Sequence, residues 1–348
     1  MLETHGRAVD RYRYSGTIAD QVPERSSYPM PLRIEHLSKT YAGGIRALDD
    51  VSLSIPVGMF GLLGPNGAGK STLMRILATL QEADTGGGTA MLDPSSDSGQ
   101  AIDILNDKEA VRRTLGYLPQ EFGLYPKVTA EEMLDHFAIL KGITNKAERR
   151  AIVGALLDQT NLSGASKRKL GTFSGGMRQR FGIAVALLGN PRLIIVDEPT
   201  AGLDPAERVR FLNLLSALGE TSVVILSTHI VDDVSELCSH MAIIDKGRIK
   251  LEAEPLAAIA ALEGKIWRRV VDRAQLPEYQ QRHAVVSTKL LAGRTVVRVH
   301  ADGRPDEGFE PSEPSLEDVY FAAMHLPSHP ERSEGSAVQP ADSSLRSE

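Results

Sequence analysis

The sequence predicts an α/β fold whose core is a mainly parallel β-sheet, and three features of the chain indicate it. A short apolar run that starts at Gly58 leads through a glycine-rich turn into a segment with apolar residues at helical spacing, the pattern of a strand, a loop and a helix. The segments 193–196 and 222–226 consist almost entirely of Val, Ile and Leu, and a helical segment separates them. Strands of this composition that alternate with helices are typical of a parallel sheet buried on both faces.

Size, charge and cysteine content limit the class of protein. At 348 residues the chain should hold one large or two modest domains, since about 100–200 residues per domain is usual. A net charge of −6 argues against binding driven by bulk positive charge, so we expect no nucleic-acid partner. Cys238 is the only cysteine, which excludes an intrachain disulfide and a cysteine-based metal site.

Nothing in the sequence suggests a membrane span or a secretory signal. The best apolar run, residues 181–188, is far shorter than the roughly 18–20 residues needed to cross a bilayer. The N-terminus carries charges without an apolar core behind them. We therefore expect a cytoplasmic protein that reaches a membrane only through a separate spanning partner.

The chain divides into four parts. Residues 1–30 mix charges and turn formers without sustained periodicity, which indicates a flexible extension. Residues 31–258 form the main domain, 259–326 a small α+β accessory region, and 327–348 a disordered tail rich in Pro, Ser and Glu.

The main domain has alternating and helical patterns in a regular order. Thr129 followed by Glu132 has the form of a helix start, and the helices that follow should build a small lobe within about 125–190. The elements we expect are strands at 32–37 and 51–55, the strand–loop–helix unit from residue 58 to Leu80, a surface excursion at 93–100 between short strands, a strand at 114–120, helices at 129–140, 146–160, 177–188 and 206–218, and the strands at 193–196 and 222–226.

The accessory region shows a weaker pattern. We expect a strand at 265–271, a hairpin of 284–291 and 295–300 around Ala292 and Gly293, and a closing helix at 315–321.

The glycine-rich turn has the spacing of a phosphate-binding loop. Its residues are Gly64, Pro65, Asn66, Gly67, Ala68, Gly69, Lys70, Ser71 and Thr72. Glycines let backbone N–H groups approach an anion, and the following helix directs its positive dipole end at the same place. The Lys70 amine can reach the β- and γ-phosphates, and the Ser71 hydroxyl can bind Mg²⁺. The alternative is a loop that only turns the chain, but the flanking strand and helix favour phosphate binding.

Further polar residues follow apolar strands and should lie at the same sheet edge. Asp197 and Glu198 end one strand, where Asp197 can hold Mg²⁺ and Glu198 can polarise an attacking water. His229 follows the next strand and is suited to contact the γ-phosphate and orient Glu198. The Gln120 amide could reach the metal or the water. Taken singly, each could be an ordinary strand end or a structural hydrogen-bonding group.

The ordered set of these motifs resembles the nucleotide-binding subunit of an ABC transporter, a P-loop NTPase, over about residues 32–256. The resemblance implies an antiparallel β subdomain, a helical signature lobe, and ATP and Mg²⁺ as cofactors. It implies that Tyr41 stacks on adenine, that Ser71, Gln120 and Asp197 hold Mg²⁺, that Glu198, His229 and Gln120 serve catalysis, and that Ser174, Gly175, Gly176 and Asp204 belong to the nucleotide site.

The signature segment departs from the family at two positions. The family usually has Leu-Ser-Gly-Gly-Gln, whereas this chain has Phe173 and Met177 at the outer positions. Ser174 and the two glycines are intact, and they form a second glycine-rich helix start suited to an anion. The resemblance implies that this segment closes on ATP bound by the opposite subunit. We therefore expect a dimer with a second copy or a similar ATPase subunit.

The transport role has one alternative, a soluble ABC ATPase without a permease, such as an iron–sulfur assembly ATPase. The accessory region and its end, from Pro314 to Phe321, resemble the ATPases of bacterial exporters whose permease is a separate chain. The resemblance places the permease contact near the Gln120 loop, with Phe122, Leu124 and Tyr125 as candidate contacts. On this interpretation the protein is peripheral on the inner face of the cell membrane.

Overall fold

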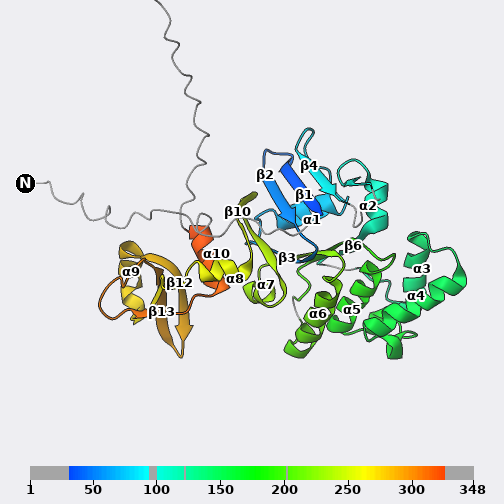
Figure 1. Cartoon of the computed structure of the whole chain (residues 1–348). Coiled ribbons are helices and arrows are strands. Elements are labelled where there is room, and N and C mark those ends of the chain that lie inside the picture. The colour runs from blue at the N-terminus through cyan, green and yellow to red at the C-terminus, as the bar shows by residue number, and fades with distance from the viewer. Residues whose placement is uncertain (1–30, 94–99, 121–122, 201–202, 326–348) are drawn as a thin grey trace, which may run out of the picture.

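The computed structural model of the chain describes residues 31–93, 100–120, 123–200 and 203–325 (Figure 1). The N-terminal extension expected at 1–30, most of the 93–100 excursion, Phe122, Ala201, Gly202 and the tail expected at 327–348 lie outside the described residues. Within the described ranges, no helix is long and apolar enough to cross a membrane.

Six strands form the central sheet in the order β10-β9-β3-β8-β7-β6. Their bounds are β3 Gly58–Leu63, β6 Leu115–Leu118, β7 Leu193–Asp197, β8 Val223–Thr228, β9 His240–Asp245 and β10 Arg248–Ala253. β3 pairs in parallel with β8 and β9, and β7 pairs in parallel with β6 and β8. Of these six strands, β10 at the edge is antiparallel to its neighbour. The expected mainly parallel sheet is confirmed.

Both faces of this sheet are buried. Successive side chains of a strand point to opposite faces, so one strand contributes to two cores. On β7, Leu193 and Ile195 pack into one core with α1 (Lys70–Leu77), whereas Ile194 and Val196 pack into another. The second core includes residues of α5 (Gly175–Ala186), α6 (Pro205–Leu218) and α7 (Val231–Leu237). α1 and the α5–α7 group therefore cover opposite faces of the sheet (Figure 1).

A four-stranded antiparallel sheet in the order β2-β1-β4-β5 shares the core of α1. Its strands are β1 Leu32–Thr40, β2 Arg46–Ile55, β4 Thr89–Leu92 and β5 Ile102–Asp103. On β1, Leu32 and Ile34 alternate onto the buried face, and a register shift before Leu37 returns that residue to the same side. This sheet is the expected antiparallel subdomain.

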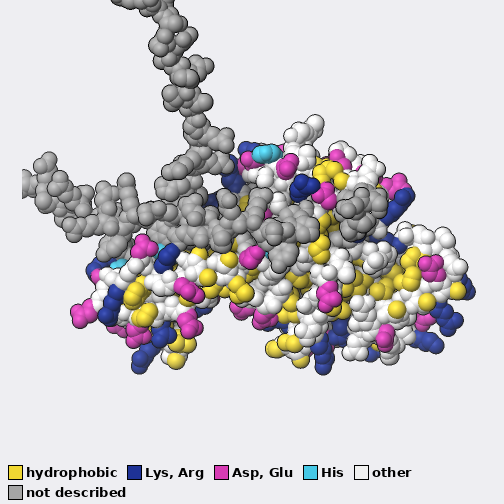
Figure 2. Space-filling model, in the orientation of Figure 1, with side chains coloured by type: hydrophobic (Ala, Val, Ile, Leu, Met, Phe, Trp, Pro, Cys, Tyr) yellow, Lys and Arg dark blue, Asp and Glu magenta, His cyan; other side chains and the backbone are white. Residues whose placement is uncertain are grey.

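The helical lobe has its own core between α3 (Ala130–Leu140), α4 (Lys146–Gln159) and α5. Thr129 and Glu132 form a reciprocal capping box that starts α3, as the sequence predicts, and Asn145 caps α4. Short 3-10 turns at Ser163–Ala165 and Leu170–Thr172 lead to α5. Figure 2 shows apolar side chains that reach the surface of this lobe among charged ones of both signs.

The C-terminal region forms a second antiparallel sheet in the order β12-β13-β11-β14. Its elements are α8 Pro255–Ala260, β11 Ile266–Val271, the 3-10 turn Arg273–Gln275, α9 Leu276–Arg282, β12 Ala284–Leu291, β13 Arg294–His300, β14 Glu310–Pro311 and α10 Leu316–His325. The expected strand, hairpin and closing helix are all present. α10 packs against α7, α8, β9, β10 and β12, so it joins this region to the central sheet.

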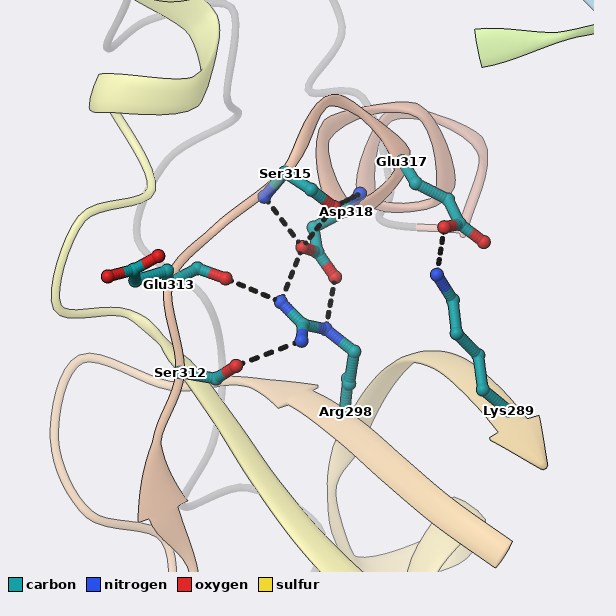
Figure 3. Close-up of polar contacts among 7 residues, drawn as sticks. All are labelled: Lys289, Arg298, Ser312, Glu313, Ser315, Glu317 and Asp318. Atoms are coloured by element: carbon teal, nitrogen blue, oxygen red, sulfur yellow. Dashed lines mark hydrogen bonds and ion pairs between the residues drawn. The ribbon is translucent and has the colours of Figure 1, made fainter. Parts of the chain in front are cut away.

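A buried ion pair fixes the start of α10 (Figure 3). The Arg298 guanidinium on β13 donates to both carboxylate oxygens of Asp318, each at 2.7 Å. It also donates to the Ser312 hydroxyl and the Glu313 carbonyl. Asp318 in turn accepts from the backbone N–H of Ser315, which completes a capping box-like start.

Several boundaries differ from the sequence-based expectation. α1 ends at Leu77, and Leu80, expected on its apolar face, is 63% exposed, because Thr79 adopts a positive φ of 59° that ends the helix. The strand expected at 114–120 is only β6, and it follows the short helix α2 (Lys108–Thr114), which the sequence did not predict. The helix expected at 177–188 begins at Gly175, because Ser174 caps it.

Candidate nucleotide site

The phosphate loop joins β3 to α1, and its backbone requires glycine at Gly69. Gly69 has φ +111°, and a Cβ there would lie 2.5 Å from the Ala47 carbonyl oxygen. The Gly247 N–H donates to the Ala68 carbonyl (2.8 Å), so the β9–β10 turn also holds the loop. Gly69 lies at the N-cap of α1 and offers no side chain to its first N–H groups, which suits them to an anion.

Lys70 lies inside this loop rather than pointing into solvent. Its side chain is only 5% exposed, and its amine donates to the carbonyls of Gly64 (2.6 Å) and Pro65 (3.2 Å). The amine is 4.0 Å from the Glu198 carboxylate. Burial lowers the pKa of Lys70, and the negative charges of Glu198 and Asp197 oppose that shift.

Glu198 and His229 meet at the carboxyl ends of β7 and β8. The Glu198 carboxylate lies 2.6 Å from His229 Nδ1 and is 10% exposed, whereas His229 is half exposed. The Glu198 N–H donates to the Ser227 carbonyl (2.8 Å), which extends the β7–β8 pairing by one residue. The structure thus brings together Lys70, Glu198 and His229, which come from three separate segments.

Asp197 has the character of a cation ligand. It is buried at the end of β7, and its Oδ1 atom has no hydrogen-bond partner among the described residues. A buried carboxylate oxygen without a donor is costly, so it suits a bound Mg²⁺ ion. In the described part of the chain, no group of three or more His, Cys, Asp and Glu side chains is placed to hold a metal ion by itself. Ser71, exposed on α1, and Gln120, exposed beyond β6, would have to supply the other protein ligands.

Tyr41 lies beside the phosphate loop. Its hydroxyl is 3.1 Å from the Thr72 hydroxyl and donates to the Gln81 amide oxygen (3.0 Å), while the side chain stays 38% exposed. A ring that is both tethered and accessible can receive a flat apolar group. Gln81 could not be predicted from the sequence, because a polar residue after a helix end is common.

The signature segment lies apart from this cluster. The Ser174 hydroxyl accepts from the Met177 N–H and starts α5, which covers the other face of the sheet from α1. Gly176 lies close to α6, because a Cβ there would be 2.6 Å from the Glu207 carboxylate. Asp204 caps α6 by accepting from the Glu207 N–H (2.8 Å). These residues therefore do not join the Lys70 cluster within one chain.

Three residues near the site were not predicted from the sequence. Thr200 and Arg208 each donate to the Asp233 carboxylate, and Thr200 and Asp233 belong to the segments that follow Glu198 and His229. A possible signal was the position of Asp233, because it precedes the buried Val234 on a short helix where a charge needs a partner.

A glycine-rich loop at a helix start, with Asp-Glu at the end of a strand of the same parallel sheet, defines a P-loop NTPase. The model of the ABC transporter family matches residues 48–201. The uncharacterized ABC transporter ATP-binding protein YxlF of Bacillus subtilis is 32% identical over 84% of this chain and 99% of its own length. The chain therefore belongs to the ABC transporter ATP-binding proteins.

Two further relatives and one solved structure are also ABC ATP-binding proteins or cassettes. The daunorubicin/doxorubicin resistance ATP-binding protein DrrA of Streptomyces peucetius is 35% identical, and the match covers 77% of each chain. The probable multidrug ABC transporter ATP-binding protein YbhF of Escherichia coli is 32% identical over 75% of this chain, which spans only 46% of that protein. A dimeric structure of the ATP-binding cassette MJ0796 with ADP and Pi is 28% identical, with a TM-score of 0.56, covering 64% of this chain and 98% of its own.

Proposed function

We propose that this chain is the Mg²⁺-dependent, ATP-hydrolysing subunit of an exporter, and that it drives a separate membrane permease through ATP-dependent dimerisation. The observation that carries hydrolysis is the Glu198–His229 pair at 2.6 Å, with the Lys70 amine 4.0 Å from the same carboxylate. A carboxylate between a phosphate-binding lysine and a histidine is suited to hold the attacking water.

Each residue has a distinct task in this proposal. The Lys70 amine exchanges its two loop carbonyls for the β- and γ-phosphate oxygens when ATP binds. Glu198 polarises the water that attacks the γ-phosphorus, and His229 holds the Glu198 carboxylate in place. Ser71, Asp197 and Gln120 would hold Mg²⁺, which neutralises charge on the phosphates.

The dimer proposal rests on where the signature segment lies. Ser174 starts α5, which packs on the face of the sheet opposite to α1, the helix that follows the phosphate loop. A second copy arranged head to tail would place each signature segment over the other chain's ATP. The dimeric structure of the MJ0796 cassette with ADP and Pi supports the formation of a dimer.

The permease and the direction of transport rest on the relatives and on the helical lobe. DrrA and the linearmycin resistance protein LnrL of Bacillus subtilis are named for drug resistance, which supports export. On the lobe, Tyr125 is 69% exposed and Leu124 is partly buried, so Tyr125 offers an apolar contact for a permease segment. Docking there would place the chain at the inner membrane face.

Hydrolysis is tested with Glu198→Gln, which keeps the side-chain shape and removes the charge. We expect this variant to bind ATP, to lose nearly all turnover, and to accumulate as an ATP-bound dimer in size-exclusion chromatography with light scattering. Glu220→Gln, on an exposed residue after α6, is the matched control and should hydrolyse ATP like the unaltered chain. Equal turnover in both variants would refute the assigned role of Glu198.

The transport role is tested by purifying the tagged chain from native membranes. We expect an integral membrane protein to co-purify in a defined ratio in mild detergent and to be lost in high salt before the ATPase itself unfolds. Purification of an active ATPase dimer without any membrane protein would favour the soluble ATPase instead.

A further inference from the structure

A fully buried carboxylate lies behind the candidate catalytic pair. Asp233, on α7, is 0% exposed. One of its oxygens accepts from the Thr200 hydroxyl at 2.6 Å, and the other accepts from Arg208 Nε at 2.8 Å. A buried charge is tolerated only when it is paired and hydrogen-bonded, so these two partners account for its position.

Thr200 and Asp233 join the same two segments that carry Glu198 and His229. Residue 200 follows Glu198 by two positions, and residue 233 follows His229 by four. The segments are already linked by the Glu198 N–H to Ser227 carbonyl bond and by the Glu198–His229 contact. The Thr200–Asp233 bond is a further link between these segments. The Glu198–His229 contact therefore lies between two hydrogen bonds, Glu198 N–H to Ser227 and Thr200 to Asp233.

The Glu198 backbone needs such support. Its φ of +49° lies in the left-handed region, which is unfavourable for a residue with a Cβ. Conformations of this kind persist only where the surrounding structure holds them. Relaxation of the segment would move the Glu198 carboxylate away from His229.

Arg208 connects this arrangement to α6. Its guanidinium lies 2.7 Å from Asp233 and 3.5 Å from Glu236, and the bond to Asp233 raises the pKa of Arg208. Because Asp204 caps the same helix, Asp233 links α7, the segment after β7 and the start of α6.

We propose that Asp233, acting through the Thr200 hydroxyl, is a positioning residue for Glu198 and His229. The inference rests on the proposed ATP hydrolysis. Neither residue has a bond to the phosphate loop in the described structure, so their loss should slow the hydrolytic step more than it weakens ATP binding. Displacement of a catalytic group by about 1 Å can cost on the order of 100-fold in rate.

The test compares three variants of the full chain. Thr200→Val keeps the shape and removes the hydroxyl, Thr200→Ser keeps the hydroxyl, and Asp233→Asn removes the charge. We expect Thr200→Val and Asp233→Asn to lower kcat about 10- to 100-fold with KM changed less than about twofold. We expect Thr200→Ser to retain most of kcat. Hydrogen exchange by mass spectrometry should show faster exchange of the amides of residues 198, 200 and 228–233 in Thr200→Val, but not in Thr200→Ser.

The outcomes separate this inference from the proposed function. Normal kcat in Thr200→Val beside an inactive Glu198→Gln would overturn the positioning role alone. Equal losses in Thr200→Val and Thr200→Ser would show that Thr200 acts by packing, which also overturns it. If Glu198→Gln hydrolyses ATP normally, the proposed function fails, and unchanged exchange in Thr200→Val would then overturn the inference separately.

Discussion

At the scale of single residues, Lys70 shows how the phosphate loop is prepared for an anion. Its amine is buried and donates to two backbone carbonyls, so the amine is already shielded from water before a phosphate binds. We expect Lys70→Ala to weaken ATP binding by about 10- to 100-fold, the range for loss of a hydrogen bond to a charged group. Isothermal titration calorimetry measures it. Lys146→Ala, on an exposed residue at the start of α4, should leave the affinity unchanged. Equal affinities for both variants would refute the phosphate contact.

Tyr41 can contribute to ATP binding in two ways, through its ring and through its hydroxyl group. If its ring stacks on adenine, Tyr41→Ala should weaken ATP binding by about 10-fold and leave inorganic triphosphate binding unchanged, since an aromatic stack contributes about 1–3 kcal/mol. Tyr41→Phe retains the ring but loses the bonds to Thr72 and Gln81, so it should retain most of the affinity. A loss in Tyr41→Phe as large as in Tyr41→Ala would show that the hydroxyl, not the ring, is what matters.

At the scale of elements, the ion pair of Arg298 and Asp318 holds α10 in place. Asp318 is 1% exposed, so removal of its partner leaves an uncompensated charge in the interior. We expect Arg298→Ala to lower the free energy of unfolding by about 3–5 kcal/mol, measured by urea denaturation.

The same helix provides a matched control. Lys289 also pairs with a carboxylate of α10, that of Glu317, but the lysine side chain is 49% exposed (Figure 3). Exposed pairs contribute little, so Lys289→Ala should cost less than about 1 kcal/mol. Similar losses in the two variants would mean that burial does not set the strength of this contact.

The elements also show what the sequence could predict and what it could not. The phosphate loop, β7, β8 and the capped start of α3 have local patterns that dictate their structure. α2 and α7 are seven residues each, too short for a clear helical period. β9 lies beside β3, about 180 residues earlier, and β10 pairs back onto β9. Such placement depends on distant partners. For the same reason the sequence identified Glu198 and His229 but not the Thr200–Asp233 bond behind them.

At the scale of the whole molecule, one hydrophobic core joins the central sheet to the C-terminal region. Ile194 and Val224 of the sheet belong to the same cluster as Ile266, Leu316 and Val319 from the C-terminal elements. The smaller core of the C-terminal sheet holds four buried side chains among the described residues. The division of the chain near residue 258 stays a prediction. The shared core means that the two parts pack against each other through buried apolar side chains.

The shared core predicts that the two parts unfold together. Trp267, the only tryptophan, lies on β11 in the C-terminal region, so its fluorescence reports that region alone. Circular dichroism reports the helices of the whole chain. Because β11 and α10 bury apolar side chains in the core of the central sheet, exposing one part removes packing from the other. We expect the two signals to change at the same urea concentration. Val319→Ala, which opens a cavity in the shared core, should lower both midpoints equally. A fluorescence transition that precedes the circular dichroism transition would show that the C-terminal region unfolds by itself.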